Sequence, residues 1–361
     1  MRGHVDPQAN MFSYYSPESR VPAAHPLRPI KTYADAVLKS MSRDFDALYA
    51  SDGRPSIAPE RLLKGSILIA LYSLRSERML CEMLDYNILF RWFLDMSMDE
   101  PGLDQSRFSR FRERLIASAC ARRFFDAVVR EARGKGLLSE EHFTVDGTLI
   151  EAWASMKSFK RKDEPRSDPG SDTQGMVDFK GEKRANATHE SSTDPDAKLR
   201  RKGLGKEAKL CFGGHALMEN RNGLCVDIRV TSATESEPQA AKELIARQRQ
   251  KHVRLKSLGG DKGYHTKAFV CHLRKRRIVP HLAMIKGRCT PGLDARTTRH
   301  ASYAISQKKR KRVEEIFGWM KTYGGLRKTM LRGIERVQSQ AWLVGAAYNL
   351  LRLSRLAPSA A

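Results

Sequence analysis

The clearest strand signal in the sequence leads directly into an acidic residue, in the stretch Phe143-Thr144-Val145-Asp146-Gly147-Thr148. Phe143 and Val145 alternate with polar residues, which is the period of a strand with one buried face. Asp146 therefore comes off a core strand, and Gly147 leaves room beside it for a phosphate or an ion. A single aspartate at the end of a strand is also typical of a turn, so its meaning depends on the rest of the chain.

Strands and helices alternate on the carboxyl-terminal side of this strand. Two strands are predicted at 209–218 and 224–230, joined by a turn at 220–223. The following pattern predicts a helix at 238–251, a short strand before Asp261, a helix at 265–276, a strand at 278–282, a helix that contains Glu314, and a last helix at 334–351. This order indicates an α/β fold, a mixed sheet flanked by helices as in ribonuclease-H-like folds.

The chain before this region is predicted to be all helical. Apolar residues recur at helical spacing between 33 and 118. Pro59 can open a helix where its missing N–H costs nothing, and Ser76 and Asp104 are candidate amino-terminal caps. We predict a helical DNA-binding domain at 33–125 and a catalytic domain at 140–355.

The helix after Asp104 is strongly basic, with Arg107 and Arg110 placed around Phe108 and Phe111. Such a helix could lie against DNA as a recognition helix. It could equally be an amphipathic helix with a solvated basic face. Both interpretations are kept open for Arg107 and Arg110.

Two segments are predicted to lack a core of their own. Residues 1–32 are rich in Pro and Tyr without periodicity, which predicts a disordered arm. Residues 155–206 form a polar basic insertion with few large apolar side chains. We expect this insertion to be mobile or to become ordered on binding, near the path of DNA.

The composition points to a polyanionic partner. The net charge of +24 favours nucleic acid. The six cysteines form no C-x-x-C pair, so no zinc motif is predicted, and no phosphate-binding loop of the G-x-x-x-x-G-K-[ST] type predicts a nucleotide cofactor. No apolar run approaches the roughly 20 residues that span a membrane, so we expect a cytoplasmic protein.

Two more acidic residues share the setting of Asp146. Asp261 opens the tetrapeptide Asp261-Lys262-Gly263-Tyr264, and Glu314 lies in a basic helix. Carboxylates at the ends of core elements in a basic chain predict a Mg²⁺ site that acts on a polyanion. Two Mg²⁺ ions about 3.5–4 Å apart can activate the attacking oxygen and stabilise the leaving oxygen of a phosphodiester.

The neighbouring Glu315 is the other candidate for the third carboxylate. At about 100° per residue, Glu314 shares a stripe with Arg310 and Lys321 that borders the apolar face of its helix. Glu315 points away from that stripe, which predicts a solvated or ion-paired side chain. Glu314 is therefore the predicted ligand.

These residues resemble the motifs of a known family. The pattern Arg310-x3-Glu314-x6-Lys321 resembles the signature around the catalytic Glu of bacterial insertion-sequence transposases of the DDE class, although the usual leading Tyr is Gln307 here. The settings of Asp146 and Asp261 are similar to those of the family's two aspartates. The helical stretch 59–115 looks like the amino-terminal domain common in this group, and the resemblance covers roughly 40–350.

The resemblance implies a function and a set of roles. Asp146, Asp261 and Glu314 would be the catalytic metal ligands for two Mg²⁺ ions, with Mn²⁺ as a substitute. Arg310 and Lys321 would hold DNA phosphates, and Tyr264 would line the site and contact the DNA.

It also implies partners and a reaction. The enzyme would bind the terminal inverted repeats of its element, cut at the ends, and join the freed 3′-hydroxyl to target DNA. It would act as a homodimer on DNA in the bacterial cytoplasm, at the nucleoid. The alternatives are a catalytically silent DNA-binding remnant and a stand-alone metal-dependent nuclease.

Overall fold

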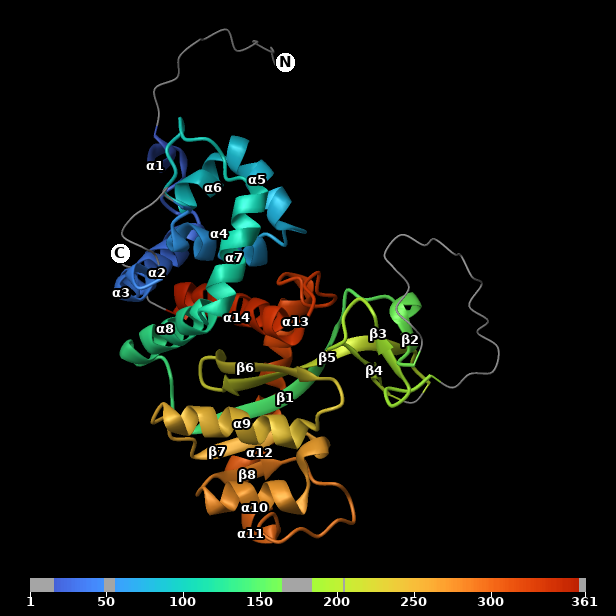
Figure 1. The fold of residues 1–361 in the computed structure, drawn as a ribbon. Coiled ribbons are helices and arrows are strands. Elements are labelled where there is room, and N and C mark those ends of the chain that lie inside the picture. The colour runs from blue at the N-terminus through green and yellow to red at the C-terminus, as the bar shows by residue number, and fades with distance from the viewer. Residues whose placement is uncertain (1–15, 49–55, 164–183, 204, 357–361) are drawn as a thin grey trace, which may run out of the picture.

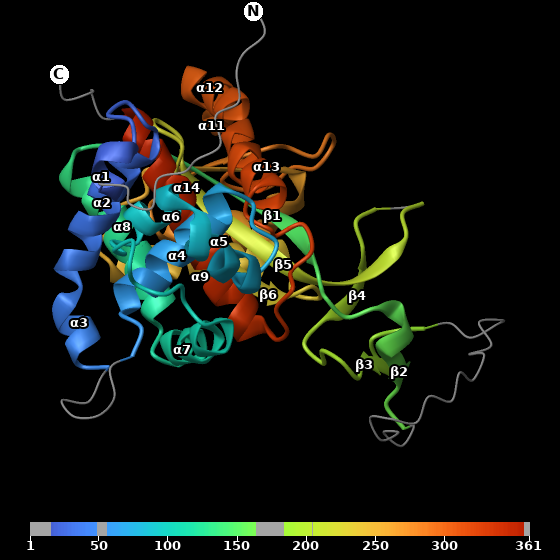
Figure 2. The ribbon, with the colours of Figure 1, turned by 90° about the horizontal axis from the view of Figure 1, so that it is seen from above.

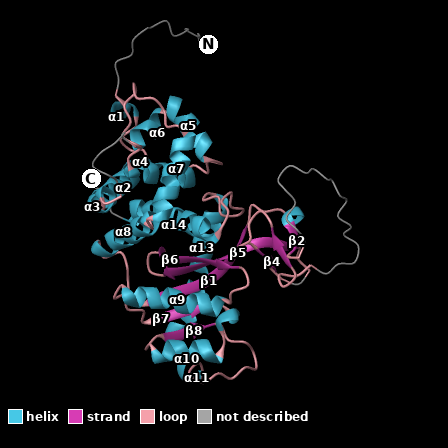
Figure 3. Cartoon of the chain, viewed as in Figure 1, coloured by secondary structure: helices cyan, strands magenta, loops and turns pink. Residues whose placement is uncertain are grey.

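A mixed sheet lies at the centre of the molecule, with helices on both faces. The computed structural model describes residues 16–48, 56–163, 184–203 and 205–356. Helices α1–α8, α13 and α14 lie on one side of the sheet, whereas α9 and α10 lie on the other (Figure 1). The same layers are visible when the chain is coloured by secondary structure (Figure 3).

The central sheet has the order β4-β5-β1-β7-β8, with β6 also paired to β5. Its strands are β1 (His142–Glu151), β4 (Lys198–Arg201), β5 (Ala208–Glu219), β6 (Leu224–Ser232), β7 (Ser257–Gly260) and β8 (Val279–Leu282). Strands β1, β5 and β6 pair antiparallel, whereas β1, β7 and β8 pair parallel. The strands and helices predicted from β1 to α14 occur in the predicted order, with β2, β3, β4 and α11 in addition. The fold is ribonuclease-H-like.

The helices fall into two groups. The amino-terminal group comprises α1 (Pro17–Arg20), α2 (Leu27–Ser40), α3 (Ser42–Asp46), α4 (Pro59–Leu71), α5 (Glu77–Tyr86), α6 (Ile88–Phe93), α7 (Gln105–Ala117) and α8 (Cys120–Gly134). The second group comprises α9 (Glu237–Gln250), α10 (Lys267–Lys275), α11 (Ala295–Thr298), α12 (Ala301–Lys309), α13 (Val313–Thr322) and α14 (Ile334–Leu356). Among the described residues, no helix has the length and apolarity to span a membrane.

Local sequence signals explain where several helices begin. Asp104 Oδ1 accepts a hydrogen bond from the backbone N–H of Arg107 at 2.8 Å and starts α7. Ser76 Oγ accepts from the N–H of Met79 at 3.1 Å and starts α5. Pro59 is the first residue of α4. Each cap satisfies backbone donors that a helix cannot satisfy internally.

The sheet separates two hydrophobic cores. One core lies between the face of β1 that contains Ile150 and the helices α2–α8, α13 and α14. The other contains Phe143 and Val145 of the opposite face with α9 and α10. Because α14 packs against α2, α4 and α8, the end of the chain shares a core with the amino-terminal helices. The division at 33–125 and 140–355 stays a prediction.

The predicted arm is wrong for the part that the structure describes. Helix α2 begins within the predicted range, and its Leu27 and Ile30 are 3% and 2% exposed in the first core. These side chains bury enough apolar surface to order the segment. Residues 1–15 lie outside the described part of the chain.

The polar insertion is partly built into the fold, which corrects the expectation that it lacks structure. Its described residues include a 3-10 turn, η1 (Met156–Ser158), a two-stranded sheet of β2 (Phe159–Arg161) and β3 (His189–Ser191), and β4 on the edge of β5. Asp196 accepts a hydrogen bond from the N–H of Ile334 at 3.0 Å, which ties the insertion to the start of α14. Residues 164–183 and 204 lie outside the described part.

Candidate active site

The parallel register of two strands brings Asp146 and Asp261 side by side. Thr144 of β1 is paired with Gly259 of β7, and each is followed two residues later by one of the aspartates. Equivalent positions on neighbouring strands face the same side of a sheet. Both aspartates are half-buried, at the carboxyl-terminal end of β7 and the adjoining part of β1.

Burial and neighbouring charges act on Asp146. Burial raises the pKa of Asp146 to about 6, with smaller upward contributions from Asp261 and Glu237. The backbone N–H of Gly147, which donates to Asp146 Oδ1 at 2.8 Å, and the charge of Arg310 act in the opposite direction. Two other carboxylates and one guanidinium therefore lie within electrostatic reach of Asp146.

Strand β1 continues past Asp146 to Glu151, so Asp146 lies within the strand rather than at its end, which corrects the expectation. Each carboxylate still accepts one local backbone hydrogen bond. Asp261 Oδ1 accepts from the N–H of Gly263 at 2.7 Å and caps the 3-10 turn η2 (Lys262–Tyr264). Within the described residues, the carboxylate of neither aspartate has a further hydrogen bond or an ion pair. The local bond uses one oxygen, so the other oxygen of each carboxylate remains available for a ligand.

Glu314 approaches the site from a helix. Helix α12, the 3-10 turn η3 (Arg310–Arg312) and α13 follow each other as one rod that reaches β1 (Figure 2), and both η3 and α13 contact β1. Glu314 is exposed in the first turn of α13, and in the described part of the chain it has neither a hydrogen bond nor an ion pair. Glu315 pairs with Arg352 of α14 at 3.5 Å, as expected for a residue outside the site.

Close packing holds the rod against the strands. A Cβ atom on Gly259 would lie 3.2 Å from Thr144 Oγ1 and 3.4 Å from the Cβ atom of Arg310. His142 Nε2 and Ser306 Oγ lie 2.6 Å apart and join β1 to α12. Arg310 therefore lies over β7 close to the two aspartates.

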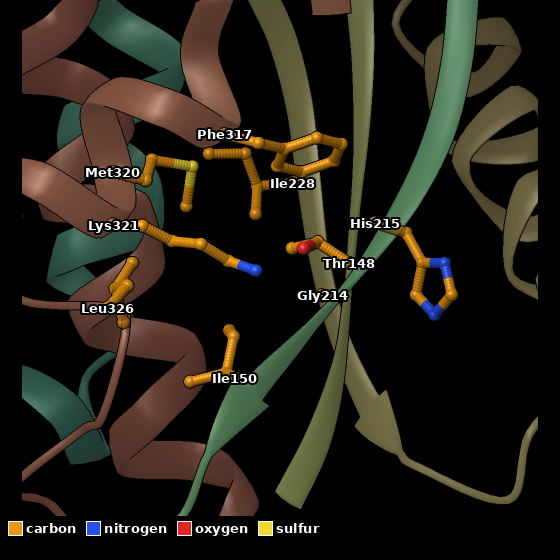
Figure 4. Close-up of a pocket in the computed structure, with 9 residues that line it drawn as sticks. All are labelled: Thr148, Ile150, Gly214, His215, Ile228, Phe317, Met320, Lys321 and Leu326. Atoms are coloured by element: carbon orange, nitrogen blue, oxygen red, sulfur yellow. The ribbon is translucent and has the colours of Figure 1, made fainter. Parts of the chain in front are cut away.

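Lys321 lies on the same helix, farther along β1. Its side chain points toward Thr148 and Gly214 in a small cavity that Phe317 and Leu326 also line (Figure 4). Burial lowers the pKa of Lys321, and the nearby charges of Lys202 and Arg327 lower it further. No acidic partner of Lys321 or of Arg310 is found among the described residues, so both cations are available to an anionic ligand.

The residue that replaces the family's tyrosine has a structural contact. Gln307 Nε2 donates to the backbone carbonyl oxygen of His281 at 2.7 Å. This bond joins α12 to β8.

Tyr264 does not lie where it could contact DNA, which corrects the prediction. Its side chain is 0% exposed, and its hydroxyl has no hydrogen-bond partner among the described residues. Burial raises the pKa of Tyr264 well above its usual value, and Glu237, Asp146 and Asp261 raise it further, in that order. The aromatic ring of Tyr264 packs in the second core, and the three carboxylates lie close to its hydroxyl.

The basic helix α7 presents three of its four arginines to solvent, Arg114 among them. Arg107 and Arg110 are exposed, whereas Arg112 pairs with Glu77 and Glu113. The buried Phe108 anchors the helix in the first core. This arrangement fits both interpretations of the helix, since exposed arginines occur on recognition helices and on solvated faces.

Sequence reasoning missed Glu237, the first residue of α9. Its carboxylate lies against Gly147 and Gly263, the glycines next to Asp146 and Asp261. Burial raises the pKa of Glu237, and Asp261 raises it further. A helix at 238–251 was predicted, but its start was not linked to the site, because nothing in the sequence shows that α9 begins beside β1.

The donors in this region suit a hard cation. Asp146, Asp261 and Glu237 supply carboxylate oxygens, which Mg²⁺ prefers, and the two glycines leave the space that a Cβ atom would fill. Across the described residues, no three histidine, cysteine, aspartate or glutamate side chains already converge closely enough to hold a metal ion. The donors are thus of a type that suits a divalent cation, although they do not converge on one point.

Two family models match the chain. The model described as "Transposase domain (DUF772)" matches residues 15–114, and the model described as "Transposase DDE domain" matches residues 173–350. Together these matches cover well over half of the 361 residues. The chain belongs to the DDE transposases of insertion sequences, a family of enzymes that cut and transfer DNA strands. The second match includes Asp261 and Glu314 but begins after Asp146.

Solved structures of transposases are also similar to the chain. The piggyBac transposase synaptic complex with hairpin DNA is 9% identical, with a TM-score of 0.40, over 94% of this chain and 77% of that chain. The Mos1 strand transfer complex is 10% identical, with a TM-score of 0.21, over 88% and 82%. At these TM-scores the likenesses add nothing to the assignment. No curated protein is significantly similar in sequence to this chain.

Proposed function

We propose that this transposase binds the terminal inverted repeats of its own element and cuts them with two Mg²⁺ ions held by Asp146, Asp261 and Glu314. The pairing of Thr144 with Gly259 supports the proposal, because the two aspartates follow on adjacent inner strands of the sheet. Glu314 follows Arg310 by one helical turn on the rod that packs over β7. Its unpartnered carboxylate can turn toward the aspartates once a cation is present.

The protein's own groups position the DNA. Arg310 and Lys321 grip phosphates on either side of the scissile bond, Arg310 with a planar fork and Lys321 as a point charge. When bound, the two ions neutralise charge at the scissile phosphate and activate the attacking oxygen. Water attacks first and frees a 3′-hydroxyl, and that hydroxyl then attacks target DNA in the same site.

Other basic residues contact the rest of the DNA. Arg107 and Arg110 of α7 contact the terminal repeats. The exposed Arg274, Lys275 and Arg277 at the end of α10 hold the backbone. Each neutralised phosphate releases counterions, so binding should weaken steeply with salt. Two element ends must meet before transfer, so the active form on DNA is a homodimer.

Cleavage and joining of oligonucleotides that carry the element's ends test the proposal. Wild-type protein is compared with Asp146→Ala, Asp261→Ala, Glu314→Ala and Glu315→Ala, in Mg²⁺ and in EDTA. Loss of both reactions in the first three variants, with retention in Glu315→Ala, supports it. Binding without cutting would favour the silent remnant, whereas cutting without joining would favour a stand-alone nuclease.

A further inference from the structure

Glu237 is held at the site by the shape of the backbone around it. A Cβ atom on Gly147 would lie 3.0 Å from Glu237 Oε1, and a Cβ atom on Gly263 would lie 3.2 Å from Glu237 Oε2. Both carboxylate oxygens therefore rest against the two segments that carry Asp146 and Asp261. A larger residue at either glycine would displace this carboxylate.

Glu237 differs from the other acids near the start of α9. Glu235 and Glu243 both pair with Arg229. Glu237 has no ion pair and no hydrogen bond within the described residues, and Arg200, the cation that acts on it, donates to the carbonyl oxygen of Ala233 at 2.6 Å. A half-buried carboxylate beside other carboxylates is unfavourable unless a cation compensates it.

The buried hydroxyl of Tyr264 is a second, independent observation. It is a polar atom without a partner in the described part of the chain, in a side chain that is 0% exposed. The three acids that act on this phenol are Glu237, Asp146 and Asp261. An unsatisfied buried hydroxyl is unfavourable, and a water molecule bound at this point would supply the missing acceptor.

We propose that Glu237 is a fourth carboxylate ligand of the divalent-cation site, acting on the ion that Asp261 holds. This inference rests on the proposed function, because the ion is the one used for cleavage. It assigns to the start of α9 a role in ion binding that neither the three-carboxylate motif nor the sequence pattern contains. A purely structural role is the competing explanation, since an acidic residue in the first turn also stabilises a helix.

Mn²⁺ binding to the full-length protein without DNA distinguishes the two roles. Calorimetric titration compares wild type, Glu237→Gln and Asp261→Asn. Glu243→Gln is the matched control, because Glu243 lies on the same helix and pairs with Arg229. We expect Glu237→Gln to weaken Mn²⁺ binding by about 10- to 100-fold, the range for residues that support a metal site, whereas Glu243→Gln leaves it unchanged.

Wild-type Mn²⁺ affinity in Glu237→Gln, together with weakened affinity in Asp261→Asn, would overturn the inference while leaving the proposed function intact. Absence of Mn²⁺ binding by wild type would overturn it as well. If Glu237→Gln fails to fold, Glu237→Asp is used instead, because it keeps the charge with a shorter side chain. Its Mn²⁺ affinity should lie between that of wild type and that of Asp261→Asn. Failure of the proposed function appears separately, as wild-type protein that binds Mn²⁺ but does not cut the element's ends.

Discussion

The strand part and the helix part of the candidate site are built in different ways. Asp146 and Asp261 are half-buried, are tied to their own backbone, and share the register of two paired strands. Glu314 is exposed on α13 and has no partner among the described residues. The sheet therefore holds Asp146 and Asp261 close together, whereas no side-chain contact within the described residues fixes the carboxylate of Glu314.

The largest expected effect comes from the strand part. Asp146→Asn and Asp261→Asn should each reduce cleavage by more than about 100-fold, because even supporting residues of a metal site are worth roughly 10- to 100-fold. Neither variant should lose thermal stability, since each removes a half-buried charge without an ion pair. Cleavage rates in Mg²⁺ and melting temperatures are measured together. Normal cleavage by either variant would contradict the assignment.

The helix part should show a sharp difference between neighbours. Glu314→Gln should abolish cleavage and change the free energy of unfolding by less than about 0.5 kcal/mol, as for exposed positions in general. Glu315→Gln should retain cleavage, because its partner is Arg352. The same assay and urea unfolding are used for both. Equal loss of activity in the two variants would contradict the assignment of Glu314 rather than Glu315 to the site.

The cations on the rod should affect DNA affinity rather than stability. Lys321→Met should make the negative slope of log affinity against log salt less steep by about 1, the value for one lost phosphate contact. Lys135→Met is a suitable control, because Lys135 follows the last residue of α8 and pairs with Glu131. Fluorescence anisotropy with an element end at several salt concentrations measures the slopes. An unchanged slope for Lys321→Met would remove Lys321 from the DNA contact.

The sheet that carries the strand part should weaken at acid pH. Burial lowers the pKa of His215, the partner of Gly147 on β5, and of His281 on β8 to about 4. Above a pH of about 6.5, these two histidines are mostly neutral in both the folded and the unfolded chain. As pH falls from there toward 4, the unfolded chain gains protons first, so stability is lost.

Urea unfolding midpoints measured between pH 7 and pH 5 test this loss of stability. His281→Asn should make the midpoint depend less on pH. His300 is exposed, so the matched variant His300→Asn should leave the pH dependence of the midpoint unchanged.

The smallest expected effect is at Tyr264. Tyr264→Phe removes a buried hydroxyl without a partner in the described structure, so it should leave stability unchanged or raise it by about 1 kcal/mol or less. Most substitutions of a fully buried side chain act in the other direction. Thermal unfolding without metal is the measurement. A clear loss of stability would show that the hydroxyl has a partner in solution.

Much of the architecture follows from local patterns. Alternation in β1, the turn before Gly223 and the caps at Ser76 and Asp104 specify their elements through short-range chemistry. Asp146 and Asp261 were also singled out from the sequence, because each follows a short apolar strand pattern. These signals depend on neighbours in sequence, so no contact between distant segments is needed to see them.

Other features depend on contacts between distant segments. Nothing in the sequence near Glu237 reports that α9 begins against Gly147, or that Tyr264 is covered. The order of residues 16–32 also went unpredicted, because it comes from the packing of α2 against α14, which lies about 300 residues later in the chain. Local propensity and spacing thus predict many of the elements and draw attention to Asp146 and Asp261. The burial of these acids and the position of Glu237 beside them arise only when the folded chain brings distant segments together.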